Sequence, residues 1–160
     1  MAMFPGEPPP LLSVLDAPGI LNESDLRKID GEVNGLSRRF PQFHWKICIV
    51  NLPPEKPLPV FGLWLLNACP LQGSETPVSR AWTVLLLINA ATGQAAAIPG
   101  YAAEPYVSDE EWKTILATMH GPWQAGKPAD AIIGFLQSTR RHLNHAWKRY
   151  GARRSSRRPS

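Results

Sequence analysis

Three carboxylates are the residues whose types and spacing best support chemistry: Glu75, Glu104 and Asp109. Each lies in or beside a polar stretch rather than inside an apolar run. Clustered carboxylates, together with loop carbonyl oxygens, are the ligands that hard cations such as Ca²⁺ and Mg²⁺ take in proteins. The pattern therefore predicts a divalent-cation site. The alternative is structural, with Asp109 as a first-turn helix acid and the two glutamates as solvated loop charges.

Three short strands are expected to position these acids. Residues 45–52 and 82–90 are almost wholly apolar, which is typical of strands buried on both faces of a sheet. Thr92-Gly93 predicts a turn, after which residues 94–98 return as an antiparallel strand. The first two strands flank a predicted helix, so we expect them to be parallel.

The hairpin brings the loops that carry the acids together. The end of the return strand must lie beside the start of the strand at residue 82, so the loops 70–80 and 100–108 share one rim of the sheet. The sequence Ser108-Asp-Glu-Glu111 matches a capping box, so a helix also begins at that rim with free amide groups.

Four segments show apolar residues at helical spacing or clear helix signals: 22–39, 58–68, 108–119 and 128–147. Asn22 is a suitable N-cap for the first of them, and Gly121-Pro122 separates the last two. Helices alternating with strands in this way predict an α/β fold. We expect about four helices to flank a small mixed sheet of three to four strands.

The length of 160 residues and the hydrophobic fraction of 44% fit one globular domain. We expect a Pro-rich N-terminal arm over residues 1–14, an α/β domain over 15–149 and a basic, disordered tail over 150–160. No apolar run is long enough to cross a membrane, and no signal peptide is visible, so the sequence leaves the compartment open.

The net charge of +4 is unevenly distributed along the chain. From Thr139 onward there are eight Lys/Arg residues and no acids, which leaves nine bases and thirteen acids in residues 1–138. An anionic partner or an anionic membrane could therefore bind the arginines of the tail, Arg153, Arg154, Arg157 and Arg158. The alternative is a solvated end. Because no aromatic residues are interleaved with these arginines, we do not expect a nucleic-acid partner.

Other patterns are less specific. His142 and His145 stand three residues apart, as metal ligands can, but no further Cys or His lies nearby, which favours a surface pair. No nucleophile elbow, phosphate-binding loop or dinucleotide fingerprint is present. Cys48 falls in an apolar run and reads as a core residue, and a disulfide with Cys69 is left open.

The order of these elements resembles the TPM domain family. The resemblance begins at Leu15-Asp16-Ala-Pro-Gly-Ile-Leu-Asn22, which is similar to the family's opening turn before an amphipathic helix. It continues through the strands and the segments Gly100-Tyr-Ala-Ala-Glu104 and Val107-Ser-Asp109, and covers roughly residues 14–147. The chain departs from the family pattern before the central strand, where Asn67-Ala-Cys-Pro70 and Arg80-Ala81 stand.

The resemblance implies that the helices and the sheet form a three-layer α/β/α sandwich, and it implies a location outside the cytoplasm or at a membrane. It also implies a divalent ion, Ca²⁺ or Mg²⁺, in some members. Asp16 and Asp109 match recurrent Asp positions of the family and Glu104 matches its acidic loop position, so the resemblance adds Asp16 to the predicted metal ligands.

Two functions follow from these readings. The first is a non-enzymatic binding or accessory module, whose partner is a protein or a membrane-associated assembly. The alternative is a divalent-metal-dependent acid phosphatase, for which Glu75, Glu104 and Asp109 would supply a cation site, while the sequence identifies no nucleophile.

Overall fold

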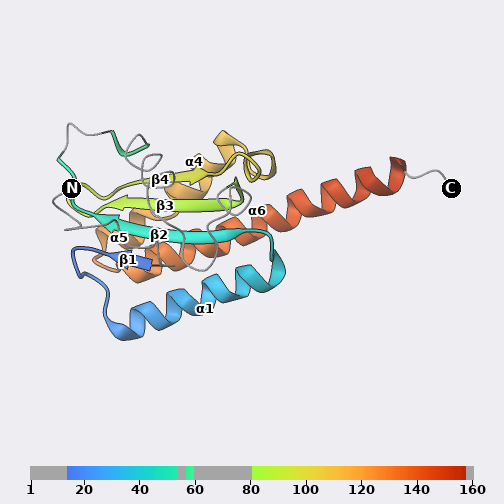
Figure 1. Cartoon of the computed structure of the whole chain (residues 1–160). Coiled ribbons are helices and arrows are strands. Elements are labelled where there is room, and N and C mark those ends of the chain that lie inside the picture. The colour runs from blue at the N-terminus through green and yellow to red at the C-terminus, as the bar shows by residue number, and fades with distance from the viewer. Residues whose placement is uncertain (1–13, 54–56, 60–80, 158–160) are drawn as a thin grey trace.

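The computed structural model describes residues 14–53, 57–59 and 81–157. A four-stranded mixed sheet runs through this part of the chain in the order β1-β2-β3-β4 (Figure 1). Its strands are β1 (Val14–Asp16), β2 (His44–Val50), β3 (Thr83–Asn89) and β4 (Gln94–Pro99). The first three are parallel, and β4 is antiparallel to β3. The predicted α/β fold and the predicted directions of the main strands are therefore confirmed.

Both faces of the central strands are buried. All seven residues of β3 are buried, and all of β2 except His44. Alternate residues enter two separate cores, because successive side chains of a strand point to opposite faces. One core contains Ile47, Ile49, Leu86 and Ile88, and the other contains Cys48, Val50, Leu85 and Leu87. This double burial explains why both strands appear in the sequence as continuous apolar runs.

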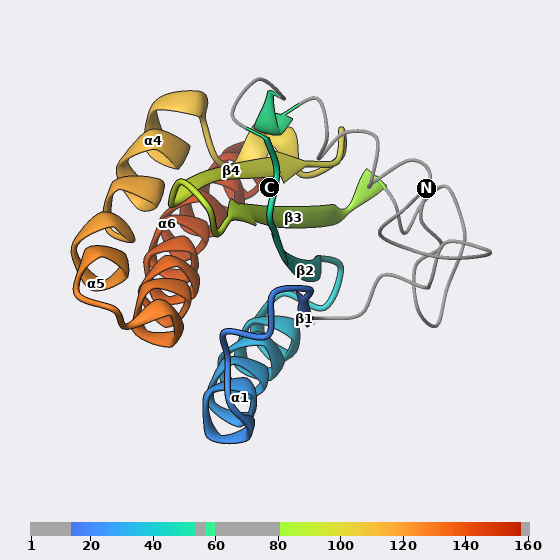
Figure 2. The same ribbon diagram turned by 90° about the vertical axis from the view of Figure 1, so that its left-hand side faces the viewer.

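The described helices cover one face of the sheet (Figure 2). They are α1 (Glu23–Arg39), α4 (Asp109–Ala117), α5 (His120–Gln124) and α6 (Pro128–Arg157), with the short 3₁₀ helix η1 (Glu104–Tyr106) before α4. The residues of the other core come from the sheet and from Leu52 and Leu58. Most of the helix predicted over residues 58–68 lies outside the described residues.

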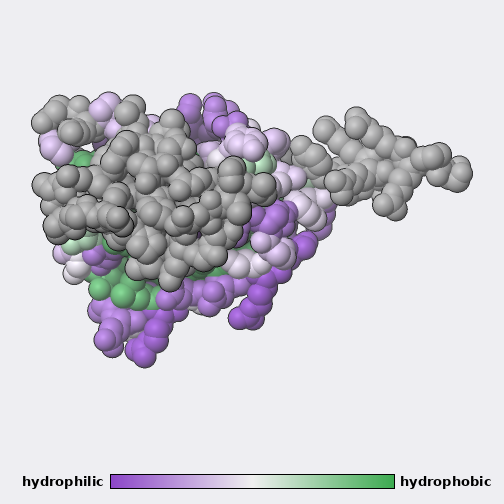
Figure 3. Space-filling view, in the orientation of Figure 1, coloured by the Kyte–Doolittle hydropathy of each residue, from purple (hydrophilic) through white to green (hydrophobic). Residues whose placement is uncertain are grey.

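Helices α1 and α6 run side by side in the same direction. Gln137 Nε2 of α6 donates a hydrogen bond to Glu32 Oε1 of α1 at 3.2 Å, and the Trp147 ring contacts Phe40 further along both helices, with centroids 5.9 Å apart. The inner stripe of α1 is Ile29, Val33 and Leu36. Its outer side is hydrophilic and forms the lower border of the molecule in Figure 3.

Both predicted helix starts are confirmed by their hydrogen bonds. Asn22 Oδ1 accepts from the Asp25 amide at 2.8 Å, and the Asp25 carboxylate accepts from the Asn22 amide at 3.2 Å. Ser108 and Glu111 form the same reciprocal pair at the start of α4, at 3.1 and 3.2 Å. These capping boxes fix where each helix leaves the preceding loop.

Three local predictions need correction. The sequence predicts the end of an irregular arm and the start of a turn at Val14–Asp16, but this segment forms β1. The strand is stabilised by its pairing with β2, which the pattern of so short a segment does not reveal. Gly121-Pro122 lies inside α5 rather than between helices, since proline is tolerated in a first turn.

The third correction concerns the C-terminal segment. Residues 150–157 continue α6 as a helix, where the sequence predicted a disordered tail. Arginine and alanine favour helix, and no proline follows until Pro159. The division into arm, domain and tail otherwise stays a prediction. Cys48 is buried, as expected, and Cys69 lies outside the described residues.

Candidate functional site

Asp16 ends β1 and organises the turn that leads into α1. Its Oδ1 accepts hydrogen bonds from the amides of Gly19 and Ile20 at 3.0 and 3.2 Å, and its Oδ2 accepts from the Leu21 amide at 2.8 Å. Gly19 adopts a positive φ of 71°, which a turn of this shape requires. The carboxylate is thus held by three backbone amides of its own loop.

The sheet register separates Asp16 from the other predicted ligands. Asp16 pairs with Ile49, which pairs with Ile88 near the carboxyl end of β3. Glu104 and Asp109 follow β4, whose last residue pairs with Val84 at the amino end of β3. Four residues of strand separate these two levels, about 13 Å along the sheet.

Asp16 therefore does not share a site with Glu104 and Asp109 in the described structure. Glu104 and Asp109 lie at the same edge, as predicted, and both are exposed; Glu75 lies outside the described residues. Within residues 14–53, 57–59 and 81–157, no three His, Cys, Asp or Glu side chains are grouped as a metal ion would require. Asp16, in addition, already accepts hydrogen bonds through both of its oxygens.

The carboxyl edge of the parallel strands carries polar groups that serve the fold. Asn89 is buried at the end of β3, where its Oδ1 accepts from the amides of Leu52 and Ala91, both at 3.1 Å. Its Nδ2 donates to the Leu52 carbonyl at 3.2 Å. One side chain thus ties the segment after β2 to the turn after β3. In the sequence, Asn89 falls within the apolar run of residues 82–90, and that pattern does not predict its hydrogen bonds.

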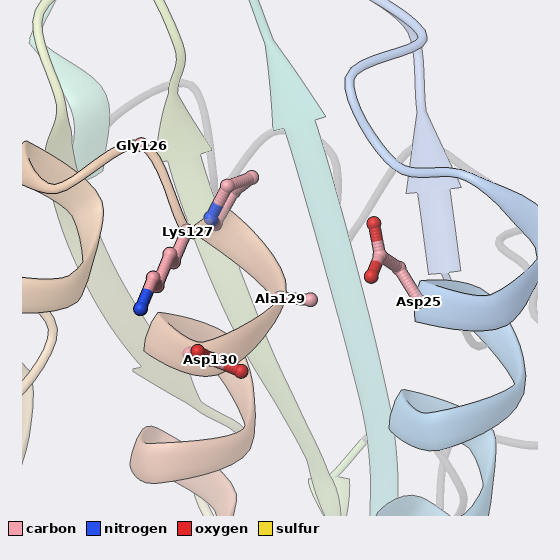
Figure 4. A pocket seen from close by; sticks show the side chains of 6 residues that line it. Asp25, Gly126, Lys127, Ala129 and Asp130 are labelled. Carbon is pink, nitrogen blue, oxygen red and sulfur yellow. The ribbon is translucent and has the colours of Figure 1, made fainter.

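A pocket of 310 Å³ opens between the starts of α1 and α6 (Figure 4). Asp25 faces it from α1, Asp130 lines it from α6, and Lys127 lines it from the residue before α6. One base and two acids give this pocket mixed charge, and one oxygen of Asp25 is engaged in the α1 cap. Such a lining suits a small polar ligand better than a phosphate, which favours cations and free amides.

Aromatic residues cluster at the end of the sheet where β2 and β3 begin, which we call its amino edge. The Phe43 ring lies 5.2 Å from Trp82, Trp82 lies 5.7 Å from Tyr106, and Tyr106 stacks on Trp147 at 5.5 Å. Phe43 is buried, whereas Trp82, Tyr106 and Trp147 are only half-buried. We call Phe43, Trp82, Tyr106 and Trp147 the aromatic edge. It joins the loop before β2, the residue before β3, η1 and α6.

One further aromatic residue lies at this end of the sheet. Tyr101 is 74% exposed in the loop after β4. Its loop is held against the start of β3, because the Gly100 amide donates to the Thr83 carbonyl at 2.7 Å and the Ala102 amide donates to the Ala81 carbonyl at 3.0 Å. The backbone at Tyr101 is therefore fixed on both sides while the ring faces solvent.

Helices α4 and α6 are joined by Glu111 and His142. His142 Nδ1 lies 2.9 Å from the Ser138 carbonyl, and its Nε2 lies 4.0 Å from Glu111 Oε2. Because a carbonyl only accepts, Nδ1 carries a proton, and the contact with Glu111 becomes an ion pair when Nε2 is protonated as well. His142 Nδ1 is thus engaged by the backbone of its own helix, and His145 is exposed.

Lys46 is a buried base on the face of the sheet opposite to α1 and α6. It is only 8% exposed and lies two residues from Cys48, which points to the same face. Burial lowers the pKa of the Lys46 ammonium group. Partial burial lowers the pKa of His44, and the positive charge of Lys46 lowers it further. The burial of Lys46 could not be predicted from local pattern, because Lys46 interrupts the apolar run without any acidic neighbour.

The part of α6 that follows Trp147 leaves the body of the molecule. Figure 1 shows the helix continuing past the amino edge of the sheet, and Trp147 is the last of its residues with a described ring contact. Arg153, Arg154 and Arg157 lie on this helical extension, and Arg158 falls outside the described residues. No helix in the described part of the chain is long and apolar enough to span a bilayer.

These features define a small α/β domain in which a mixed sheet is covered by helices, with a capped turn at one edge and an aromatic surface at the other. The chain belongs to the TPM domain family, which it matches over residues 14–142. No curated protein shows significant similarity to it.

Solved structures with the same fold come from several bacteria. The N-terminal domain of a P. gingivalis protein superposes with a TM-score of 0.64 at 15% identity, covering 85% of this chain and 84% of that one. The BA42 protein of Bizionia argentinensis gives 0.61 at 12% identity, with 79% and 83% covered. The N-terminal domain of the cg2496 protein of Corynebacterium glutamicum gives 0.59 at 12%, with 84% and 78% covered. These similarities concern the fold.

Proposed function

We propose that this TPM domain is a non-enzymatic binding module that works in a membrane-associated or envelope assembly. The aromatic edge is the observation that carries the proposal. Three half-buried rings, Trp82, Tyr106 and Trp147, lie together on one side of the domain, and Tyr101 is exposed in a loop at the same end of the sheet. Aromatic side chains supply large contact areas at little entropic cost, and they are enriched at protein interfaces.

The arrangement of the polar residues supports the same reading. Asp16 holds a turn, Asn89 ties two loops, and Glu111 caps a helix and contacts His142. A phosphoryl-transfer site instead needs a positioned nucleophile and cations or donors directed at the developing charge. Asp16, Asn89 and Glu111 form hydrogen bonds with the backbone of the domain itself.

A divalent-metal-dependent acid phosphatase is the second candidate. Only the position of the pocket between α1 and α6 favours it, because the pocket lies beside the starts of two helices, whereas the acids Asp25 and Asp130 in its lining oppose a bound phosphate. Ligands of α/β proteins commonly bind at the carboxyl ends of parallel strands. Ca²⁺ or Mg²⁺ would then be the cofactor, with ligands drawn from residues other than the triplet of Asp16, Glu104 and Asp109.

Thermal unfolding with and without Ca²⁺ or Mg²⁺ distinguishes the two functions, together with hydrolysis of p-nitrophenyl phosphate at acid and neutral pH. A binding module shows no hydrolysis above that of a heat-inactivated sample. Metal-dependent hydrolysis, with a melting temperature that rises with metal concentration, would establish the phosphatase instead.

Site-specific photo-crosslinking in cells tests the binding role directly. A photoreactive residue at Tyr101 should give the same discrete crosslinked species in repeated experiments, whereas one at Lys113, exposed on α4, should not. Replacing Trp147 by alanine should weaken the crosslink from position 101. Equal labelling from both positions would mean that the aromatic edge is no interface.

A further inference from the structure

The end of α6 concentrates the positive charge of the chain. From Thr139 to the C-terminus there are eight Lys/Arg residues and no acids, whereas residues 1–138 hold nine bases and thirteen acids. Six of the eight bases fall after Trp147: Lys148, Arg149, Arg153, Arg154, Arg157 and Arg158. The positive segment is therefore attached to a body whose own net charge is negative.

The helix carries this charge away from the body. Figure 1 shows α6 extending beyond the sheet and beyond the end of α1. The ten residues from Lys148 to Arg157 span about 15 Å as a helix. The Debye length at physiological ionic strength is about 8 Å, so the acidic body and an anion bound at the helix end interact only weakly.

We infer that the basic end of α6 docks the domain on an anionic lipid surface. The inference rests on the proposed role in a membrane-associated assembly and names the lipid bilayer as one of its contacts. A planar surface can meet the projecting helix end while the acidic body stays away from it. A long polynucleotide that bent around the helix would approach the acids of the body, and the arginines lack the interleaved aromatic residues on which single-stranded bases stack.

The position of the aromatic edge, at the base of the projecting helix, fits docking on a membrane. Polybasic segments next to a membrane are attracted by anionic headgroups, and Trp and Tyr are enriched at the membrane interface. The Trp147 ring and the Tyr106 ring stack at the base of the projecting segment. A helix that tilts on the bilayer would thus bring the aromatic edge toward the headgroups without unfolding any described element.

Vesicle co-sedimentation of the full chain tests the inference. We expect binding to phosphatidylcholine vesicles that contain about 30% phosphatidylglycerol, little binding to pure phosphatidylcholine, and loss of binding as the salt concentration rises to about 0.5 M. Each base near an anionic surface contributes about a fivefold gain in partitioning, so Arg153→Glu/Arg154→Glu should lower it about 25-fold or more.

A matched control separates position from net charge. Arg27→Glu/Lys28→Glu changes two exposed bases on the outer side of α1. Both double variants change the formal charge from +4 to 0, since each replacement removes one positive charge and adds one negative charge. The α1 variant should bind within about twofold of the wild type, because only charges within a Debye length of the bilayer contribute.

Three results would overturn the inference: equal losses in both variants, equal binding to neutral vesicles, or a short DNA duplex that displaces the protein from vesicles at lower concentrations than anionic lipid. Crosslinking from Tyr101 can persist in each of these cases. The docking of α6 and the binding role of the domain can therefore fail separately.

Discussion

At the scale of single residues, the acids that look most chemical in the sequence have structural partners. Asp16 is the clearest case, because its two oxygens accept three hydrogen bonds from the backbone between Gly19 and Leu21. An ionised carboxylate that accepts several amides stabilises the turn that orients α1. Its role as a metal ligand would require at least part of this network to open.

Asp16→Ala should therefore destabilise the domain by about 2 kcal/mol, since hydrogen bonds to charged groups each contribute more than neutral ones. Asp109→Ala, at an exposed first-turn position of α4, should cost only about 0.5 kcal/mol. Urea unfolding of both variants measures the difference. Equal small losses, combined with weaker Ca²⁺ binding in Asp16→Ala, would return Asp16 to the role of ligand.

Lys46 allows a second test at this scale, because its burial lowers its pKa. Lys46→Met should raise the free energy of unfolding by about 1 kcal/mol at neutral pH, since it removes the desolvation of a charged group. Lys28→Met, at an exposed position on α1, should change it by less than about 0.5 kcal/mol.

The effect of Lys46 depends on pH with a definite sign. The unfolded chain binds the Lys46 proton more tightly than the folded chain, so the stability of the wild type rises with pH between the lowered pKa and the ordinary value of 10.5. The gap between Lys46→Met and the wild type should close across that window. A gap that stays constant from pH 7 to pH 10.5 would show that Lys46 keeps its charge in the fold at no cost.

At the scale of elements, turn chemistry determines how the strands are paired. The β3–β4 hairpin closes through Asn89, whose carbonyl accepts from the Thr92 and Gly93 amides at 3.3 and 2.8 Å. Gly93 has a positive φ of 76°, and a Cβ added there would lie 3.0 Å from the Trp123 ring. The hairpin and α5 therefore meet where a side chain does not fit.

Gly93→Ala should cost about 2 kcal/mol, because an L-residue is strained at this φ and the Trp123 ring must also move. Gly121→Ala provides the control. A Cβ at Gly121 in α5 meets nothing within 4 Å, so alanine there should be neutral or stabilising by up to about 1 kcal/mol. Similar melting temperatures for the two variants would contradict this account of the turn.

At the scale of the whole molecule, the domain and the projecting end of α6 should be energetically separate. The core under the helices contains Ile132, Phe135, Leu136 and Leu143 of α6, all upstream of Trp147. These core residues stabilise the domain through the burial of apolar surface. A helical segment that leaves the body contributes little beyond its own helix propensity. Six of the eight bases that follow Thr139 also lie beyond Trp147.

Removal of residues 151–160 should accordingly shift the melting temperature by less than about 2 °C, while Leu136→Ala should cost about 3 kcal/mol, or roughly 9 °C for a domain of this size. Differential scanning calorimetry gives both values. A large loss on truncation would mean that the end of α6 packs against the domain.

The sequence by itself determined most of the elements and their order, but not β1 or α5. Strands β2, β3 and β4 and the capped starts of α1 and α4 follow from local patterns, since hydrophobic periodicity and capping residues act over a few positions. The TPM family was indicated by its resemblance to the order of these elements. Only the tertiary structure decided which side chains meet. Strand register places Asp16 and Glu104 at opposite edges, and it gathers Phe43, Trp82, Tyr106 and Trp147 at one of them. Contacts between residues far apart in the chain depend on pairing and packing that no local pattern encodes.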